Sequence, residues 1–195
     1  TDVYSWCPSN VSSHIIEKVR GNSPLYLRQT DFEYYDDGLL KKKISDPGSE
    51  NSLREYFEYD SIGNITEIKR RVTGEELRTH LYSYDTRGRF VKSETGPTGF
   101  VTKMDYEGTY GNMIEHIDIN GLLTEYHYDD FGNLTETVFP DGSRKIMNKT
   151  WYSDNAFPYA IICKETFTDG RPSMMNCYDE LGREIGEKTV AFNGE

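Results

Sequence analysis

Adjacent tyrosine and aspartate residues recur along the chain, and their type and spacing could do chemistry. The clearest pairs are Tyr59-Asp60, Tyr84-Asp85, Tyr128-Asp129 and Tyr178-Asp179. Evenly spaced phenols and carboxylates could face a sugar or a cation. In the structural alternative, tyrosine packs in a core and aspartate accepts backbone N–H groups to fix a turn. The repetition favours this alternative, because every unit of a repeat needs the same turn.

The rest of the sequence carries no pattern typical of catalysis or metal binding. It contains no Gly-x-Ser-x-Gly elbow, His-Glu-x-x-His motif, phosphate-binding loop or dinucleotide fingerprint. The histidines are His14, His80, His116 and His127. None stands at zinc-ligand spacing from a cysteine or another histidine. We therefore predict no catalytic residue, no metal, no cofactor and no enzymatic activity.

The tyrosines belong to an internal repeat. The motif tyrosines are Tyr34, Tyr59, Tyr84, Tyr106, Tyr128, Tyr152 and Tyr178. Their steps of 25, 25, 22, 22, 24 and 26 residues average 24. The associated glycines are Gly38, Gly63, Gly88, Gly111, Gly132 and Gly182. The unit at Tyr152 has Ala156 where glycine is expected, so it is the least regular of the seven.

Each unit predicts a pair of antiparallel strands. A second turn signal lies about midway between motifs, at Thr73-Gly74, Asn120-Gly121, Asp141-Gly142 and Asp169-Gly170. Before four of the motifs, aromatic residues stand two apart, as Phe57 and Tyr59 do, and Met104 stands two before Tyr106, which places each pair on one face of a strand. We predict strands ending within two residues of each motif tyrosine. We also predict φ > 0 at the motif glycines of the regular units, Gly63, Gly88, Gly132 and Gly182.

Length, charge and composition limit the fold and function classes. A compact chain of this length is expected to bury roughly 70% of its unfolded surface. The net charge of −11 argues against nucleic-acid and anionic-membrane partners. The apolar runs are too short for a transmembrane helix. We interpret residues 1–24 as a degenerate leading unit or cap and residues 25–195 as the array, within one structural domain. Thr1 suggests a processed chain or an excised fragment.

Cys163 and Cys177 stand at nearly symmetrical positions about the Asp169-Gly170 turn, and each lies seven residues from Gly170. A hairpin with a short odd-numbered loop would face them across neighbouring strands, where they could form a disulfide. The alternative is a pair of reduced, partly buried thiols. Cys7 would be left over in either case.

Aromatic residues also mark the irregular unit, and they are the candidate ligand-binding residues. They are Trp151, Tyr152, Phe157 and Tyr159, to which Trp6 could add. Exposure of this cluster would favour a binding surface, and burial would favour a purely structural role. Stacking on a sugar or a protein suits these side chains better than proton transfer does.

The repeat units resemble the YD-repeat, or Rhs (rearrangement hotspot), family. Its unit is Tyr-Asp, then Gly-Asn or Gly-Arg, then an aliphatic residue. Ile65, Phe90, Met113, Leu134 and, one place late, Ile185 occupy that last position. The resemblance covers roughly residues 25–190, and the tail 178–194 looks especially like bacterial secreted and wall-associated members.

The resemblance implies an all-β fold, in which tandem β-hairpins of about 24 residues form a curved, spiralling antiparallel sheet, as in a hollow shell. Similar repeats occur in toxin-complex cocoons, interbacterial toxins and teneurin adhesion receptors, and they have been proposed to bind carbohydrate. Large members cleave themselves at a C-terminal Asp-containing motif, which this sequence lacks. Seven units are also too few to close a large cocoon.

Together these features predict a non-enzymatic structural scaffold, a shell segment or surface-presented segment of a secreted or cell-surface bacterial Rhs-like protein. The alternative is a carbohydrate- or protein-binding module that uses an exposed aromatic strip. The expected partners are neighbouring repeats of a larger chain, with a glycan or another protein as further candidates. Nucleic acid and membrane insertion are not expected.

Overall fold

The computed structural model describes residues 10–21, 23–152 and 156–190, and every regular element among them is a β-strand. This confirms the all-β prediction. Trp6 and Cys7 lie outside the described residues. The chain divides into two compact units, Thr1–Val101 and Thr102–Glu195. None of the described residues belongs to a helix that could cross a membrane.

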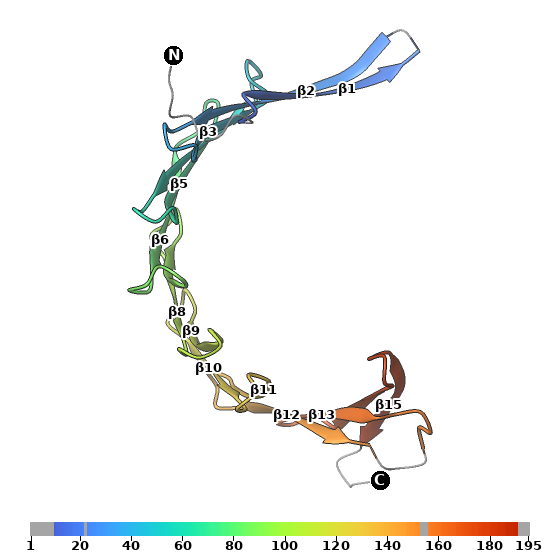
Figure 1. Ribbon diagram of the computed structural model, residues 1–195. Helices are drawn as coiled ribbons and strands as arrows, with labels where there is room; N and C mark the ends of the chain where they lie inside the picture. The colour runs from blue at the N-terminus through green and yellow to red at the C-terminus, as the bar shows by residue number, and fades with distance from the viewer. Residues whose placement is uncertain (1–9, 22, 153–155, 191–195) are drawn as a thin grey trace. The chain divides into compact units, whose positions relative to one another are not determined.

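Strands of the first unit pair in the order of the sequence, and each runs antiparallel to its neighbour (Figure 1). They are β1 (Ser13–Arg20), β2 (Ser23–Tyr34), β3 (Leu40–Ser45), β4 (Leu53–Tyr59), β5 (Ile65–Val72), β6 (Arg78–Tyr84) and β7 (Val91–Thr95).

Strands of the second unit follow the same rule, and the first of them begins at the boundary residue Val101. They are β8 (Val101–Tyr106), β9 (Met113–Ile117), β10 (Leu123–Tyr128), β11 (Leu134–Val138), β12 (Arg144–Trp151), β13 (Ile162–Thr168), β14 (Ser173–Tyr178) and β15 (Glu184–Val190).

The predicted strand ends are confirmed. Six strands end at a motif tyrosine, namely β2, β4, β6, β8, β10 and β14. β12 ends at Trp151, one residue before Tyr152. The strands stop there because the following turn needs a glycine in the left-handed region. The expected positive φ is confirmed at Gly63 (92°), Gly88 (66°), Gly132 (78°) and Gly182 (73°).

A β-bulge accompanies each regular motif, and the sequence pattern did not predict it. Glu58 pairs with Glu67, whereas the next residue, Tyr59, pairs with Ile65, so Thr66 is left without an opposite residue. The same register shift occurs at Tyr34, Tyr84, Tyr106, Tyr128 and Tyr178. A bulge interrupts the ladder of backbone hydrogen bonds locally, which frees a backbone group for another partner.

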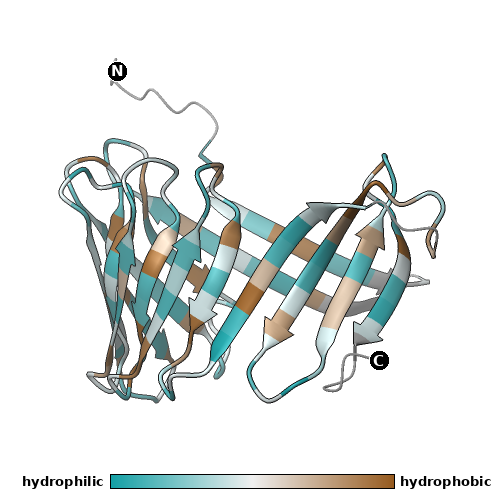
Figure 2. Cartoon of the chain, turned by 90° about the horizontal axis from the view of Figure 1, so that it is seen from below, coloured by the Kyte–Doolittle hydropathy of each residue, from teal (hydrophilic) through white to brown (hydrophobic). Residues whose placement is uncertain are grey.

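The core is thinner than the burial of roughly 70% of the unfolded surface that is expected of a compact chain. Among the side chains that the structure describes, the apolar residues that are buried are Ile68, Cys163 and Cys177. The physical reason is that within each unit the strands pair edge to edge, in a single sheet, so most inward-facing side chains stay half-buried. Hydrophobic and hydrophilic residues are interleaved along the strands, as period-two alternation requires (Figure 2).

A charged cluster replaces part of that apolar core in the first unit. The Glu55 carboxylate on β4 binds Lys43 of β3 at 3.0 Å and Arg70 of β5 at 2.9 Å. Burial raises the pKa of Glu55, but the Arg70 and Lys43 cations outweigh it, and the net pKa is lowered. The ionised carboxylate therefore joins three successive strands.

Candidate functional site

The motif aspartates act within their own turns. The Asp60 Oδ1 atom accepts the N–H groups of Ile62 at 3.0 Å and Asn64 at 2.9 Å. The Asn64 side chain amide also donates to Asp60 Oδ2 at 3.1 Å. The carboxylate is therefore occupied by the turn, as the structural alternative requires.

The same arrangement holds in later units and shifts the acidity of their carboxyl groups. The Asn133 side chain and backbone hydrogen bonds lower the pKa of Asp129. The backbone and side chain of Arg183 likewise lower the pKa of Asp179. In the unit at Tyr106, Glu107 replaces aspartate and accepts the N–H groups of Thr109 and Tyr110. These acids are ionised turn anchors.

Three motif tyrosines join their unit to the one before it. The Tyr59 hydroxyl donates to the Leu40 carbonyl at 2.9 Å, and the Tyr84 hydroxyl donates to the Ile65 carbonyl at 2.8 Å. Tyr128 makes the equivalent bond to Met113 at 2.8 Å. Each acceptor pairs with the preceding motif tyrosine at the β-bulge. The tyrosine of the following unit thus donates a hydrogen bond to a backbone carbonyl at the β-bulge, where the ladder of backbone hydrogen bonds is interrupted.

Turn residues of one unit also lie against the motif glycine of the next. A β-carbon at Gly88 would come within 2.1 Å of Ile62 Cδ1, and one at Gly132 would come within 3.3 Å of the Tyr110 ring. Asn64 donates its side chain amide to the Gly88 carbonyl at 2.7 Å. The glycine is therefore needed both for its positive φ and for the close approach of the preceding turn.

The irregular unit uses its tyrosine differently. The Tyr152 hydroxyl accepts the Phe157 backbone N–H at 3.2 Å, and the two rings lie 5.9 Å apart. The Phe157 ring covers Gly186 of β15, where a β-carbon would come within 2.1 Å of it. Tyr152 and Phe157 are thus half-buried, because their rings pack against each other and Phe157 also packs against β15.

The other two candidate aromatic residues are open to solvent. Trp151 is 77% exposed and Tyr159 is 80% exposed. The four predicted residues therefore divide into a packed pair, Tyr152 and Phe157, and an exposed pair, Trp151 and Tyr159.

Cys163 and Cys177 lie directly opposite each other on β13 and β14 and form a disulfide. Both are fully buried, at 1% and 0% exposure. Thr150 of β12 and Gly186 of β15 extend the same row across the sheet. The disulfide therefore lies between the strand that carries Trp151 and the glycine that Phe157 covers.

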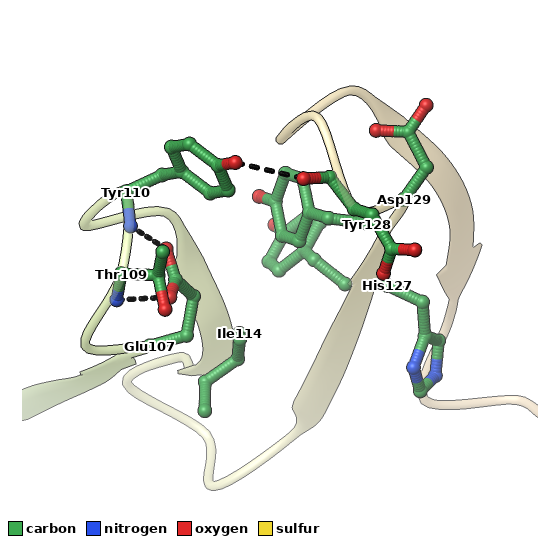
Figure 3. Close-up of a pocket in the computed structure, with 9 residues that line it drawn as sticks. Glu107, Thr109, Tyr110, Ile114, His127, Tyr128 and Asp129 are labelled. Carbon is green, nitrogen blue, oxygen red and sulfur yellow. Dashed lines mark hydrogen bonds between the residues drawn. The ribbon is translucent and has the colours of Figure 1, made fainter.

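Two surface grooves lie at equivalent places between consecutive motif turns. The first, here the Tyr110 groove, has a volume of about 450 Å³ and is shown in Figure 3. Its lining residues are Glu107, Thr109, Tyr110, Ile114, Tyr126, His127, Tyr128, Asp129 and Asp130. The second, here the Ile62 groove, has a volume of about 540 Å³, and Ile62, Tyr82, Tyr84, Thr86 and Arg87 are among its lining residues.

Sequence reasoning missed the contacts that connect one unit to the next. The roles of Ile62, Asn64 and Tyr110 depend on partners 20 or more residues away. A usable signal was present, since Ile62, Phe131 and Leu181 all place an apolar residue directly before the motif glycine.

Comparisons with known proteins agree with this architecture. Residues 109–144 match the family model described as RHS Repeat. Human Teneurin-4 is 31% identical over 90 residues, which cover 43% of this chain and 3% of the teneurin. The chain therefore spans a small fraction of this relative's length.

Solved structures share the fold. TcdB2-TccC3 without its hypervariable C-terminal region aligns over 93% of this chain and 11% of its own, with a TM-score of 0.60 and 13% identity. TcdB2-TccC3-Cdc42 aligns over 92% of this chain and 11% of its own, with a TM-score of 0.57 and 11% identity. At this identity the likeness concerns the fold alone.

Proposed function

Since the chain contains an Rhs/YD-repeat region, we propose that it works as a non-catalytic structural scaffold, a shell segment or surface-presented segment of a secreted or cell-surface bacterial Rhs-like protein. In this proposal residues 1–24 are a leading unit or cap, and residues 25–195 are the array. Its main partners are neighbouring repeats of a larger chain.

One observation carries the proposal: in the units at Tyr59, Tyr84 and Tyr128, the phenol and the carboxylate of the motif are both occupied by structural bonds. The Tyr84 hydroxyl binds the Ile65 carbonyl of the preceding unit, and the Asp85 carboxylate accepts the N–H groups of Arg89 and Phe90. A side chain whose polar atoms are held in the fold is poorly placed to transfer a proton to a substrate.

The Cys163–Cys177 disulfide supports an extracellular or cell-surface location. Disulfides persist mainly in oxidising environments, such as those outside the cytosol. Because both sulfur atoms are buried, reductants in solution reach them poorly, which suits a structural bond.

A screen for hydrolase activity on glycoside, ester and peptide substrates, combined with Tyr84→Phe, tests the scaffold. We expect no turnover from the wild-type chain and a loss of stability in the variant. The proposal of a non-catalytic scaffold would be contradicted if the wild-type chain turned over a substrate and a folded variant, substituted outside the motifs, did not.

A second candidate function is a carbohydrate- or protein-binding module, and the exposure of Trp151 and Tyr159 favours it. Large aromatic faces open to solvent are suited to stacking against a sugar ring or another protein. Tyr152 and Phe157 would then support the loop that carries Tyr159, and the exposed pair would make the contact.

A glycan array with Trp151→Ala and Tyr159→Ala tests this candidate. Phe131→Ala is a matched control, because Phe131 is 84% exposed but belongs to a regular turn. Loss of binding in the first two variants and not in the control supports the module. Absence of binding to any glycan rejects the carbohydrate form of it.

A further inference from the structure

The Tyr110 groove differs in charge from its counterpart earlier in the chain. Glu107, Asp129 and Asp130 line it, and its lining includes no lysine or arginine. In the Ile62 groove, the acids Asp60 and Asp85 are accompanied by Arg87. The same place in two repeats is therefore anionic in one and partly neutralised in the other.

The three acids of the Tyr110 groove are not equivalent. Both Glu107 and Asp129 hold backbone N–H groups of their own turns. Asp130 is exposed, and its carboxylate has no hydrogen-bond or ion-pair partner among the described residues. Thr86 stands at the same motif position in the Ile62 groove. Asp130 is thus the groove acid with oxygen atoms available to a ligand.

An aromatic wall completes the groove. Tyr110, Tyr126 and Tyr128 line it, and the Tyr110 hydroxyl donates to the Asp130 carbonyl at 2.7 Å, across to the next turn (Figure 3). Tyr110 is 58% exposed, so ring surface stays open to solvent. This hydroxyl bond and the bond from its backbone N–H to Glu107 at 2.6 Å hold the ring in place before any ligand arrives.

Aromatic faces beside carboxylates attract organic cations. A guanidinium or ammonium group is attracted to the face of a tyrosine ring, and the planar guanidinium also matches a carboxylate by two parallel hydrogen bonds. A guanidinium also gives up its hydration more readily than an ammonium does. Lys149 acts electrostatically on Asp129 but does not line the Tyr110 groove, so it does not occupy this place.

We propose that the Tyr110 groove binds an arginine-type side chain of a basic protein segment, with the guanidinium on the Asp130 carboxylate and against the Tyr110 ring. The net charge of −11 would assist the approach of such a segment. This proposal goes beyond the scaffold, because a scaffold does not require an occupied groove. The Ile62 groove, which has isoleucine, threonine and arginine at the matching positions, would not bind the same ligand.

Titration with N-acetyl-arginine methylamide, followed by amide chemical shifts at neutral pH, tests the proposal. We expect saturable shifts around Tyr110, Tyr126 and Asp130, and none around Ile62 and Arg87. Asp130→Asn should weaken the binding roughly two- to fivefold, because one exposed ion pair is lost. Tyr110→Ile, which copies the Ile62 groove, should weaken it roughly twofold or more.

Glu180→Gln is the matched control, because Glu180 follows the Tyr178-Asp179 pair as Asp130 follows Tyr128-Asp129. It changes the net charge equally and should leave the affinity unchanged. Equal weakening by Glu180→Gln and Asp130→Asn would overturn the proposal in favour of non-specific attraction. Absence of saturable shifts in the Tyr110 groove would overturn it as well.

A reciprocal variant tests the proposal independently of folding effects in the Tyr110 groove. Thr86→Asp with Arg87→Phe transfers the local charge pattern of Tyr128–Gly132 to the Ile62 groove. We expect new ligand-dependent shifts around Tyr82 and Tyr84, weaker than those of the Tyr110 groove because Ile62 lacks an aromatic ring. A correctly folded variant without these shifts would show that the charge pattern does not determine binding.

Discussion

The regular repeats and the irregular unit at Trp151–Ile161 hold their strands together in different ways. In the regular repeats at Tyr59, Tyr84 and Tyr128, the tyrosine hydroxyl donates to a carbonyl of the preceding unit, as Tyr84 does to Ile65. In the irregular unit the Tyr152 hydroxyl accepts a bond from Phe157 in its own loop. A disulfide between Cys163 and Cys177 joins the strands that follow.

This difference indicates which units depend on adjacent units for their stability. A single sheet gains little from buried apolar surface, so each regular unit relies on hydrogen bonds and turn contacts with the adjacent one. The irregular unit lacks the motif glycine, having Ala156 instead, and gains a covalent link nearby. Its exposed aromatic residues therefore lie beside a cross-linked pair of strands: Trp151 ends β12, which pairs with β13, and Tyr159 precedes β13.

Removal of the disulfide should have the largest effect. Cys163 and Cys177 are 14 residues apart, and closing a loop of this size stabilises a fold by about 3 kcal/mol. Cys163→Ser with Cys177→Ser should lower the free energy of unfolding, measured in urea, by about that amount. Amide exchange should accelerate more in β13 and β14 than in β4 and β5.

The wild-type chain that is unfolded and then refolded in dithiothreitol is the control for this first prediction, since reduction in the unfolded state breaks the same bond without a substitution. An equal loss of protection against amide exchange in β13–β14 and in β4–β5 would show that the C-terminal strands do not depend specifically on the disulfide.

Alanine at two motif glycines should separate backbone strain from contact between repeats. Gly63 has a φ of 92° and open space around a β-carbon, so Gly63→Ala should cost on the order of 1 kcal/mol through strain alone. Gly88→Ala should cost up to about 1 kcal/mol more, because Ile62 must also move.

Urea unfolding of both variants measures these costs, and Ile62→Ala combined with Gly88→Ala should recover the additional part. Equal costs at Gly63 and Gly88, with no recovery in the double variant, would show that the contact between consecutive turns does not contribute to stability.

Loss of a single tyrosine hydroxyl should have a smaller effect. Tyr84→Phe leaves the Ile65 carbonyl without its bond and should cost about 1 kcal/mol of unfolding free energy. Tyr152→Phe removes only an acceptor for the Phe157 N–H within a surface loop, so its cost should be lower. A larger cost for Tyr152→Phe would reverse the proposed roles of the two tyrosines.

Acidification should weaken the turns, with the smallest contribution from any one site. The folded-state pKa values of Asp129 and Asp179 lie below the ordinary value of 3.8, because hydrogen bonds favour the ionised carboxylates. Their stabilisation is complete above that value and is lost as the pH falls through the lower folded-state pKa. The urea concentration at the unfolding midpoint should therefore decrease as the pH is lowered from about 6 to about 2.

Asp129→Asn is the matched variant for the pH series. It should reduce the stability at neutral pH and make the decrease on acidification shallower than in the wild-type chain. A variant whose midpoint falls as steeply as that of the wild type would show that Asp129 does not contribute to the acid response.

Sequence reasoning located the repeat, the strand ends at Tyr59 and Tyr128, and the positive φ of Gly63 and Gly132. These features depend on local rules, namely the alternation of side chains along a strand and the freedom of glycine in a tight turn. It did not anticipate how thin the core is, since the expected burial assumes a compact shape that a single sheet does not have.

The amino-acid sequence by itself thus determined an all-β chain of hairpins, because turn and strand preferences act over a few residues. Only the tertiary structure decided which carbonyl each tyrosine hydroxyl binds, where the ladder is interrupted by a bulge, and that Asp130 and Tyr110 line one groove. The Tyr59 and Leu40 partners are 19 residues apart, and Tyr110 and Asp130 are 20 apart. Such pairs meet only after the strand register is set, because a shift of one residue would turn every side chain to the opposite face.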